Sequence, residues 1–473
     1  MNLVILMSDE HNRNVLGCYG HPFVQTPNLD RLAAQGTMFS DAYCNSPICV
    51  PSRASFATGR YVHQTGHWDN AHPYCGTPLS WHHAVRDAGF DSVSIGKLHF
   101  RGGDDNGFSE EILPLHVLNG IGDLKGLVRR PLPDKKGAEA MARDAGRGES
   151  GYCRYDKAIR DSAVSWIRQN RATGRPFVLF VSFVMPHFPL VAPAEFYDLY
   201  EHLPLAALRE GLDAPPPDHP ALRETRRYMG YDQHFDDTRR AIGLRAYFGM
   251  VSAIDAFAGE ILDELDRDGA QDTAVIYTSD HGEGLGNHGF WGKSTMYEDS
   301  VTVPLILRGP GVSAGHRCAT PVSLIDIFPT VLDATGADGP DDLPGRSLFE
   351  LARGADEPDR SVFSEYHAAG APTGVFMLRR GRMKLIEYAG MVPQLFDLKA
   401  DPGEMNDLAS DPAHAAALDE LRREMRRICD PEAVNQQVFR DQQRKIEEHG
   451  GVETVLRGID IPHTPAPETT TSR

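Results

Sequence analysis

Acidic side chains follow two short apolar runs of this chain, each at the point where a strand is expected to end. Asp9 comes just after the run 2–7, and Asp280 comes directly after the run 273–279. Ligand sites in open α/β sheets lie outside the carboxyl ends of strands, so two such loops can meet around one divalent cation. An Asp after a strand is more often a turn or capping residue, and for Asp9 alone that interpretation would be favoured. The two loops together favour a metal site.

Two basic side chains follow a third apolar run, 91–95. Lys97 and His99 lie two residues apart, so in an extended chain both side chains point to the same side. An ammonium and an imidazole in that arrangement can contact one small anionic group. A Lys-x-His pair by itself is more often solvated surface, so its meaning depends on what else the chain contains.

The segment 49–53 reads Cys-Val-Pro-Ser-Arg, and Thr-Gly-Arg follows at 58–60. An isolated Cys-x-Pro is usually a buried cysteine beside a proline turn. The full segment resembles the signature of the sulfatase family, in the alkaline phosphatase superfamily. In that family a formylglycine-generating enzyme oxidises the cysteine to formylglycine, whose hydrate attacks the sulfur of a sulfate ester. After attack, deprotonation of the second hydroxyl of the hydrate re-forms the aldehyde and expels sulfate. An ordinary Ser or Cys has no such second hydroxyl.

Further segments carry the same resemblance, and they extend over nearly the whole chain. They are Gly-Lys-Leu-His at 96–99, Pro-His-Phe-Pro at 186–189, Gly-Phe-Trp-Gly-Lys at 289–293 and Gln-Leu-Phe-Asp-Leu at 394–398. The resemblance implies a catalytic set of Cys49, Arg53, Lys97, His99, His187 and Lys293. It also implies that one divalent ion is held by Asp9, Asp280, His281 and the modified Cys49.

Two positions depart from the commonest family pattern at the expected metal site. Glu10 stands where many sulfatases have a second Asp, and its longer side chain leaves its role as a ligand open. His281 stands where many have Asn, and an imidazole moves an all-oxygen, calcium-like site toward one that can hold manganese. The resemblance implies Ca²⁺, and the imidazole of His281 leaves Mn²⁺ open as the alternative.

The expected reaction is hydrolysis of sulfate monoesters, of aryl or small alkyl type and including choline sulfate. Within the family the chain looks most similar to choline sulfatases and bacterial arylsulfatases, through the segments 68–71 and 364–367. Three residues are candidates for binding the organic half of the substrate: Trp68, Asn70 and Glu365. One alternative is hydrolysis of phosphodiesters or phosphonate monoesters by the same apparatus. Another is a non-catalytic binding protein in which Cys49 stays unmodified.

Apolar runs alternate with helical patterns, which predicts an α/β fold with a mostly parallel sheet flanked by helices. The expected strands are 2–7, 91–95, 177–184, 273–279 and 302–307, and the expected helices are 28–35, 155–169 and 240–267. We predict a catalytic domain over 1–355 and a smaller subdomain over 356–473. In the subdomain, strands at 361–366, 374–379 and 382–388 precede a charged helical region, 411–448. Two polar stretches, 128–151 and 203–238, are expected to be a loop and a surface insertion, and the tail from Pro462 is expected to be disordered.

The composition limits the partners. A net charge of −18 over 473 residues argues against nucleic acid and anionic membranes, although one small anion can bind a locally basic pocket. Seven scattered cysteines do not suggest a disulfide framework, and the first residues lack the features of a signal peptide. We therefore expect a cytoplasmic protein. The charged region 411–448 resembles the tails by which choline-sulfatase-like relatives hold a neighbouring subunit, and this resemblance implies a homo-oligomer, a dimer or tetramer. Packing of the region on its own domain is an equal alternative.

Overall fold

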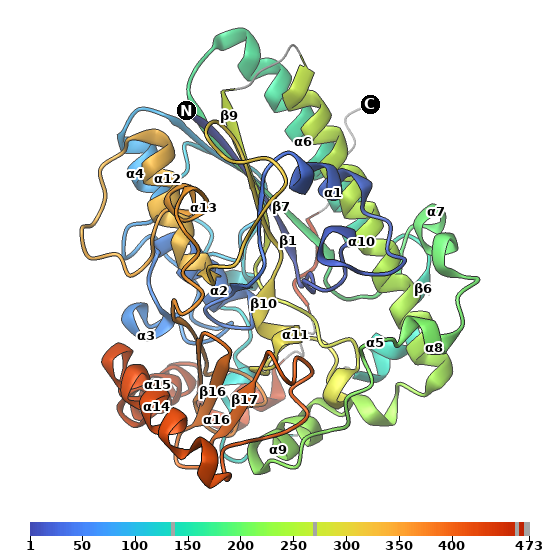
Figure 1. Cartoon of the computed structure of the whole chain (residues 1–473), viewed down its shortest axis with the longest axis vertical. Helices are drawn as coiled ribbons and strands as arrows, with labels where there is room; N and C mark the ends of the chain where they lie inside the picture. The colour runs from blue at the N-terminus through green and yellow to red at the C-terminus, as the bar shows by residue number, and fades with distance from the viewer. Residues whose placement is uncertain (134–137, 268–271, 459–462, 468–473) are drawn as a thin grey trace.

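A twisted eight-stranded sheet forms the centre of the computed structural model, which describes residues 1–133, 138–267, 272–458 and 463–467 (Figure 1). The strand order across it is β12-β2-β11-β9-β1-β7-β4-β5. Their bounds are β1 (Asn2–Asp9), β2 (Thr37–Phe39), β4 (Asp91–Lys97), β5 (Glu110–Leu115), β7 (Phe177–Pro186), β9 (Thr273–Ser279), β11 (Leu305–Arg308) and β12 (His316–Cys318). The five strands from β9 to β5 are mutually parallel, which confirms the predicted fold class.

The predicted strand 302–307 is wrong as a single element. Pro304 divides it into β10 (Thr302–Val303) and β11, and the two pieces belong to different sheets. Proline has no backbone N–H to donate to a ladder, so the chain changes direction there. β10 joins β3 (Ala42–Tyr43) and β13 (Val322–Ser323) in a small sheet, while β11 pairs antiparallel with β9.

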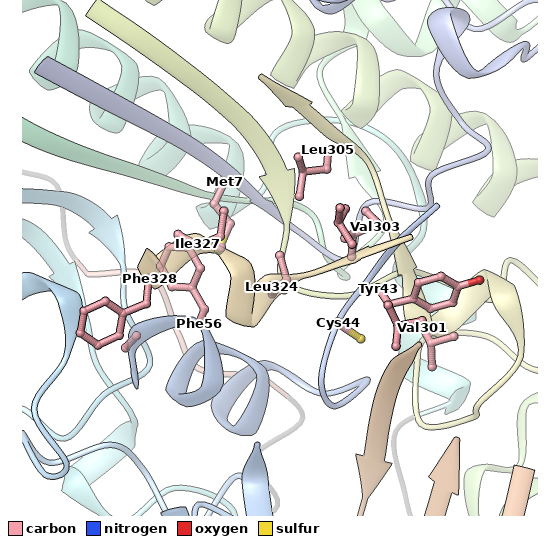
Figure 2. Packing of buried hydrophobic residues seen from close by; sticks show 14 of the residues in the cluster. Met7, Tyr43, Cys44, Phe56, Val301, Val303, Leu305, Leu324, Ile327 and Phe328 are labelled. Atoms are coloured by element: carbon pink, nitrogen blue, oxygen red, sulfur yellow. The ribbon is translucent and has the colours of Figure 1, made fainter. Parts of the chain in front are cut away.

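Two layers of helices cover the two faces of the sheet. Successive buried residues of β1 point to opposite faces, so they pack against different layers. Val4 and Leu6 pack with α1 (Pro27–Ala34), α6 (Gly151–Thr173) and α10 (Asp237–Asp266). Leu3, Ile5 and Met7 face α2 (Cys49–Thr58), α4 (Trp81–Asp87) and α12 (Ile327–Thr335). Figure 2 shows this second layer, with Phe56 of α2 beside Ile327 and Phe328 of α12.

Helix α10 is long and apolar enough to cross a membrane by length and composition. However, 83% of its most apolar window is buried inside the fold, the pattern of a core helix. The shorter elements are α3 (Val62–Thr65), α5 (Ala138–Asp144), α7 (Ala194–Tyr197), α8 (Leu205–Leu208), α9 (Pro220–Met229), α11 (Glu298–Val301), α13 (Leu348–Arg353), β6 (Gly146–Arg147) and β8 (Val191–Ala192).

The C-terminal part is a four-stranded antiparallel sheet with helices, as predicted. It contains β14 (Val362–Tyr366), β15 (Val375–Arg380), β16 (Met383–Tyr388), β17 (Gln394–Asp397), α14 (Ala415–Ile428), α15 (Pro431–Glu448) and α16 (Gly451–Arg457). Helix α15 packs on its own chain through buried polar side chains: Asp441 accepts from Trp68 Nε1 at 3.0 Å, and Gln442 donates to Asp69 at 2.8 Å. The boundary near residue 355 and the homo-oligomer stay predictions.

Three expectations about the polar stretches need correction. The stretch 203–238 is not merely surface, since α9 buries Leu222, Tyr228 and Met229. The stretch 128–151 contains helix α5, the first residue of α6 and part of a two-stranded sheet. In the tail, residues 463–467 lie against the body of the molecule rather than being disordered, because apolar Ala466 packs on the core. Pro462 and residues 468–473, where disorder was also expected, lie outside the described residues.

Candidate active site at the carboxyl ends of the central strands

The parallel strands bring the predicted site residues to one edge of the sheet. Asp9 ends β1, Lys97 ends β4, Asp280 follows β9, and His187 follows β7. All four strands are neighbours and run in the same direction, so their last residues converge. A hydrogen bond from Glu10 N to Asp280 Oδ1, 3.2 Å long, ties the first loop to the second.

Cys49 begins helix α2 at the centre of this edge. Its Sγ lies 3.3 Å from His281 Nε2, 3.3 Å from Lys293 Nζ and 3.7 Å from Asp9 Oδ1. Every residue of α2 is buried, and the side chain of residue 49 stands at the helix N-terminus, where the helix dipole favours negative charge. Burial, helped by the nearby Asp9 charge, raises the pKa of the Cys49 thiol to about 12. An unmodified thiol here is protonated at neutral pH and is therefore a poor nucleophile.

Arg53, one turn further along α2, joins the two acidic loops. Its Nε donates to Asp280 Oδ2 at 2.8 Å, and its Nη2 lies 3.3 Å from Asp9 Oδ2. Lys97 Nζ also contacts Asp9 Oδ2. Burial alone would raise the pKa of Asp9, but Lys97, the other nearby cations and the Arg53 guanidinium hold that pKa well below its usual range. Both Asp9 and Arg53 are therefore charged in the folded protein.

Lys97 and His99 were expected to reach the same site because they lie on one side of an extended strand. They do reach the same site, but the chain between them is not an extended strand. The β4 ladder shifts register after Ile95, the strand ends at Lys97, and His99 has a left-handed φ of 55°. Gly96 permits the turn, because a Cβ there would meet the Ser182 carbonyl oxygen. Both side chains nevertheless reach the same site.

The donor set fits a divalent cation. Ligand atoms of Asp9, Cys49, Asp280 and His281 all lie within 4.8 Å of one another, and all four residues are buried. Burial lowers the pKa of His281, so its ring is neutral, and its Nδ1 lies 3.1 Å from Gly282 O. With Nδ1 protonated toward that carbonyl, the Nε2 lone pair faces the carboxylates. Two carboxylates and one imidazole are suitable ligands for Ca²⁺ or Mn²⁺.

Glu10 faces the same space from a left-handed backbone position, with φ at 66°. Its Oε2 lies 3.3 Å from Lys293 Nζ and 3.5 Å from His187 Nε2, and its carboxyl also hydrogen-bonds the buried carboxyl of Glu283. Burial raises the pKa of Glu10 to about 8, and the neighbouring Glu283 adds to that rise. Glu10 therefore borders the metal-binding group and has partners of its own.

A cavity of about 110 Å³ opens above these residues. Its inner half, next to the strand ends, is lined by Glu10, Cys49, His99, His187 and Lys293. Its outer half is lined mainly by aromatic and apolar side chains, including Tyr152, Phe188, Met229, Tyr231, Tyr366 and His463. Neither ring nitrogen of His99 has a hydrogen-bond partner among the described residues, and burial beside Lys97 and Arg53 holds its pKa well below its usual value. His99 is therefore a neutral imidazole facing the cavity.

The three residues expected to bind the organic half have different positions. Asn70 lines the cavity, where its Oδ1 accepts from Val50 N at 3.2 Å. Trp68 is only 4% exposed and donates to Asp441, away from the cavity. Glu365 is fully buried between His63 and His367, with contacts of 2.8 and 2.9 Å.

Sequence reasoning missed several residues of the outer half: Tyr152, Met229, Tyr231, Tyr366 and His463. Tyr366 sits beside Glu365, in a segment that the resemblance had marked. Tyr231 and Met229 lie in the stretch that was interpreted as surface. Aromatic and apolar residues within otherwise charged, Pro-rich sequence were the available signal.

Comparison with known proteins agrees with this geometry. The family model for sulfatases matches residues 1–337, and the model for the C-terminal region of N-sulphoglucosamine sulphohydrolase matches residues 286–430. The chain belongs to the sulfatase family. Sulfatases hydrolyse sulfate esters. Among relatives of this sulfatase, a choline-sulfatase of Rhizobium meliloti is 32% identical over 87% of this chain and 83% of its own length. An arylsulfatase K of Danio rerio is 32% identical over 93% and 86%.

Solved structures show the same sulfatase fold. A protein solved with its substrate D-glucosamine-2-N,6-O-disulfate superposes with a TM-score of 0.71 at 24% identity, covering 93% of this chain and 98% of that one. A phosphonate monoester hydrolase from Silicibacter pomeroyi has a TM-score of 0.71 at 25% identity, covering 90% and 94%.

Proposed function

We propose that this sulfatase hydrolyses sulfate monoesters of small aryl or alkyl alcohols, choline sulfate among them, at a formylglycine derived from Cys49. The observation that carries the proposal is the position of Cys49 Sγ at the start of α2, within 3.3 Å of both His281 Nε2 and Lys293 Nζ. A group attached at this position meets a metal-binding cluster on one side and cations on the other. As a neutral thiol it would perform neither role.

Asp9, Asp280 and His281, with residue 49, would hold one divalent ion, Ca²⁺ or alternatively Mn²⁺. When present, formylglycine supplies the attacking hydroxyl of its hydrate, and the ion lowers the pKa of that hydroxyl. Arg53 keeps the two Asp loops together, since it contacts both carboxylates. Lys97, 3.9 Å from Cys49 Sγ, adds positive charge where the sulfate is bound.

Three further residues would handle the proton and the leaving oxygen. His99 is neutral and has no hydrogen-bond partner in the part of the chain that the structure describes, so it can accept a proton from a hydroxyl on residue 49. Lys293 and His187 line the cavity on the same side as Glu10 and can support charge on the departing oxygen. Burial and nearby cations hold the pKa of His187 well below its usual value, so protonation of this imidazole would require the bound anion.

The lining of the cavity supports a substrate whose organic half carries no second anionic group. Among the described residues that line it, Lys293 is the only lysine or arginine, and it belongs to the inner half. The outer half offers rings, apolar groups and one acid, Asp123. Such a wall suits a planar, apolar or cationic group better than a second sulfate or a carboxylate.

The decisive experiment combines a mass measurement with a substrate ranking. The peptide containing residue 49 should have the mass of formylglycine in active protein. Sulfate monoesters should then be cleaved with higher kcat/KM than phosphodiesters or phosphonate monoesters with matched leaving groups. The reverse ranking would establish the second candidate, phosphonate or phosphodiester hydrolysis, which the likeness to a phosphonate monoester hydrolase favours. A thiol at residue 49 without turnover would indicate a binding protein.

The remaining proposals concern the cellular setting. We infer a cytoplasmic enzyme that is matured by a formylglycine-generating enzyme and assembles as a homo-oligomer. Measurement of the molecular mass in solution tests the assembly into a homo-oligomer, and cell fractionation tests the cytoplasmic location.

A further inference from the structure

The C-terminal segment, residues 463–467, reaches the cavity from the far end of the sequence. His463 and Thr464 line the cavity opposite the inner half. Tyr152 Oη donates a 2.6 Å hydrogen bond to Thr464 O, and Ala466 packs against the core cluster that contains α6 and α10. Both a polar contact and an apolar contact therefore hold the segment in this place.

His463 belongs to a group of rings that leads to the inner half. Its ring meets those of Tyr152 and Phe188 edge to face, at centroid distances of 5.4 and 5.8 Å. Phe188 in turn stacks on His187, with centroids 4.4 Å apart. The tail residue thus contacts the side chains that border the position expected for the leaving group.

One ring nitrogen of His463 has no partner within the described part of the chain. Nδ1 is buried and makes no hydrogen bond to any described residue. Leaving a buried polar atom without a partner is destabilising, so such atoms are usually paired with protein, water or a bound molecule. Because His463 lines the cavity, a molecule bound there can supply that partner.

We propose that the C-terminal segment completes the substrate cavity of its own chain, and that His463 is a specificity-determining residue whose ring contacts and hydrogen-bonds the organic half of the ester. The proposal rests on the proposed function, because it assumes that the sulfate occupies the inner half. It extends that function by assigning recognition of the organic half to a residue more than 400 positions away from Cys49 in sequence.

Binding measurements test the proposal without relying on turnover. Full-length Cys49→Ala protein, loaded with the divalent ion, is titrated with 4-nitrophenyl sulfate and with inorganic sulfate. Adding His463→Ala should weaken ester binding about 3- to 12-fold, the range expected for one hydrogen bond. Binding of inorganic sulfate should change less than about 2-fold. Ending the chain after Gly458 should weaken ester binding at least as much.

Two matched variants separate recognition from structure. Pro465→Ala alters an exposed residue of the same segment and should bind both ligands normally. His463→Gln, which keeps a hydrogen-bonding side chain, should recover part of the lost affinity. Equal ester affinity in the His463→Ala and unchanged proteins would overturn the inference. Failure of inorganic sulfate to bind any variant would instead contradict the proposed function itself.

A mixing experiment tests whether the segment acts within one chain. Full-length Cys49→Ala protein is refolded together with matured protein that ends after Gly458 and keeps residue 49. If each segment serves its own cavity, the mixture retains the raised KM of the shortened protein. Recovery of the normal KM would place the segment in a neighbouring subunit and overturn the proposal. Melting curves of the shortened protein confirm that it remains folded.

Discussion

The inner and outer halves of the cavity are built in different ways. The inner half is supplied mainly by the ends of parallel strands and the start of α2, and its side chains are charged, buried and linked through Arg53. The outer half is supplied by α6, α9, the end of β14 and the C-terminal segment, and it consists mainly of rings and apolar groups. The first arrangement fixes a reaction, whereas the second leaves recognition of the organic half to elements that can vary independently.

Substitutions in the inner half should also cost more free energy than substitutions in the outer half. Removing one charge from the inner half leaves its buried partners uncompensated, which is strongly destabilising. Removing a ring from the outer half loses packing and contact area with the ligand, but it leaves no buried charge without its partner. Variants of the two halves should therefore differ in the size and in the kind of their effects.

Cys49→Ala should have the largest effect, a loss of kcat of about 10⁴-fold or more, because the nucleophile cannot form. Steady-state kinetics with an aryl sulfate measures it. Cys75→Ala, at a cysteine that does not line the cavity, is the matched control and should retain full activity. Appreciable turnover by Cys49→Ala would rule out residue 49 as the nucleophile.

Asp280→Asn should lower kcat/KM by about 10³-fold, since it removes a ligand charge and weakens the link to Arg53. Metal analysis should find the ion content reduced together with activity. Asp263→Asn, at an exposed carboxylate paired with Arg31, provides the control and should keep both. A normal ion content in Asp280→Asn would contradict the assigned metal site.

His281→Asn should shift the preference toward Ca²⁺ over Mn²⁺, because an amide oxygen replaces an imidazole nitrogen. We expect about a 10-fold change in the ratio of the two dissociation constants, measured on protein stripped by chelation and reloaded with each ion. An unchanged ratio would mean that His281 does not bind the ion.

Tyr231→Ala in the outer half should raise KM about 5- to 10-fold, because ring contacts with the organic half are lost, and should also lower kcat, because its hydroxyl lies beside Glu10 and Lys293. Trp68→Phe is the informative comparison. Its ring donates to Asp441 outside the cavity, so this change should lower the melting temperature and leave KM unaltered. A raised KM in Trp68→Phe would restore the sequence-based assignment of that residue.

The smallest effect is a pH-dependent change in stability from Glu365→Gln. Burial alone would raise the pKa of Glu365, but His63 and His367 outweigh it and lower that pKa to about 2. Its contribution is therefore present above the ordinary value of 4.5 and is lost as the pH falls toward 2. Burial alone would lower the pKa of His63, but Glu365 outweighs it and raises that pKa above 6.5. The contribution of the pair is therefore also lost as the pH rises above 6.5.

Wild type and Glu365→Gln should consequently differ most in melting temperature between about pH 4.5 and 6.5, and less on either side. Scanning calorimetry from pH 3 to 8 measures the difference. A constant difference across the range would show that the charge on this pair does not contribute.

The inner half could be predicted from sequence because the sheet does most of the positioning. Once the runs ending at Asp9, Lys97 and Asp280 are recognised as parallel neighbours, their last residues must meet. The left-handed turn at His99 had no signal except Gly96, and it changes how the residue arrives without changing where. Pro304 was a sequence signal for the break between β10 and β11. The apolar residues on both sides of it instead suggested one continuous strand.

The outer half could not be predicted in the same way, because its members depend on tertiary packing. Tyr231 and Met229 occur in a stretch whose charge and prolines suggested surface, and only the docking of α9 and of the turn after it brings them to the cavity. Glu365 and Trp68 lie in segments that resemble substrate-binding regions, yet Glu365 is held between two histidines and Trp68 against α15. No local pattern distinguishes a ring that faces a cavity from one that faces a neighbouring helix.

The burial of α2 has a consequence for the order of events in the life of the chain. Cys49 is 1% exposed and already helical once the protein has folded, with the strand ends on one side and the C-terminal sheet nearby. The proposed oxidation of Cys49 by a second enzyme would need access to this side chain, which the folded protein does not give. On that proposal, maturation would have to precede folding of the newly made polypeptide, and the fraction of active molecules would depend on which finished first.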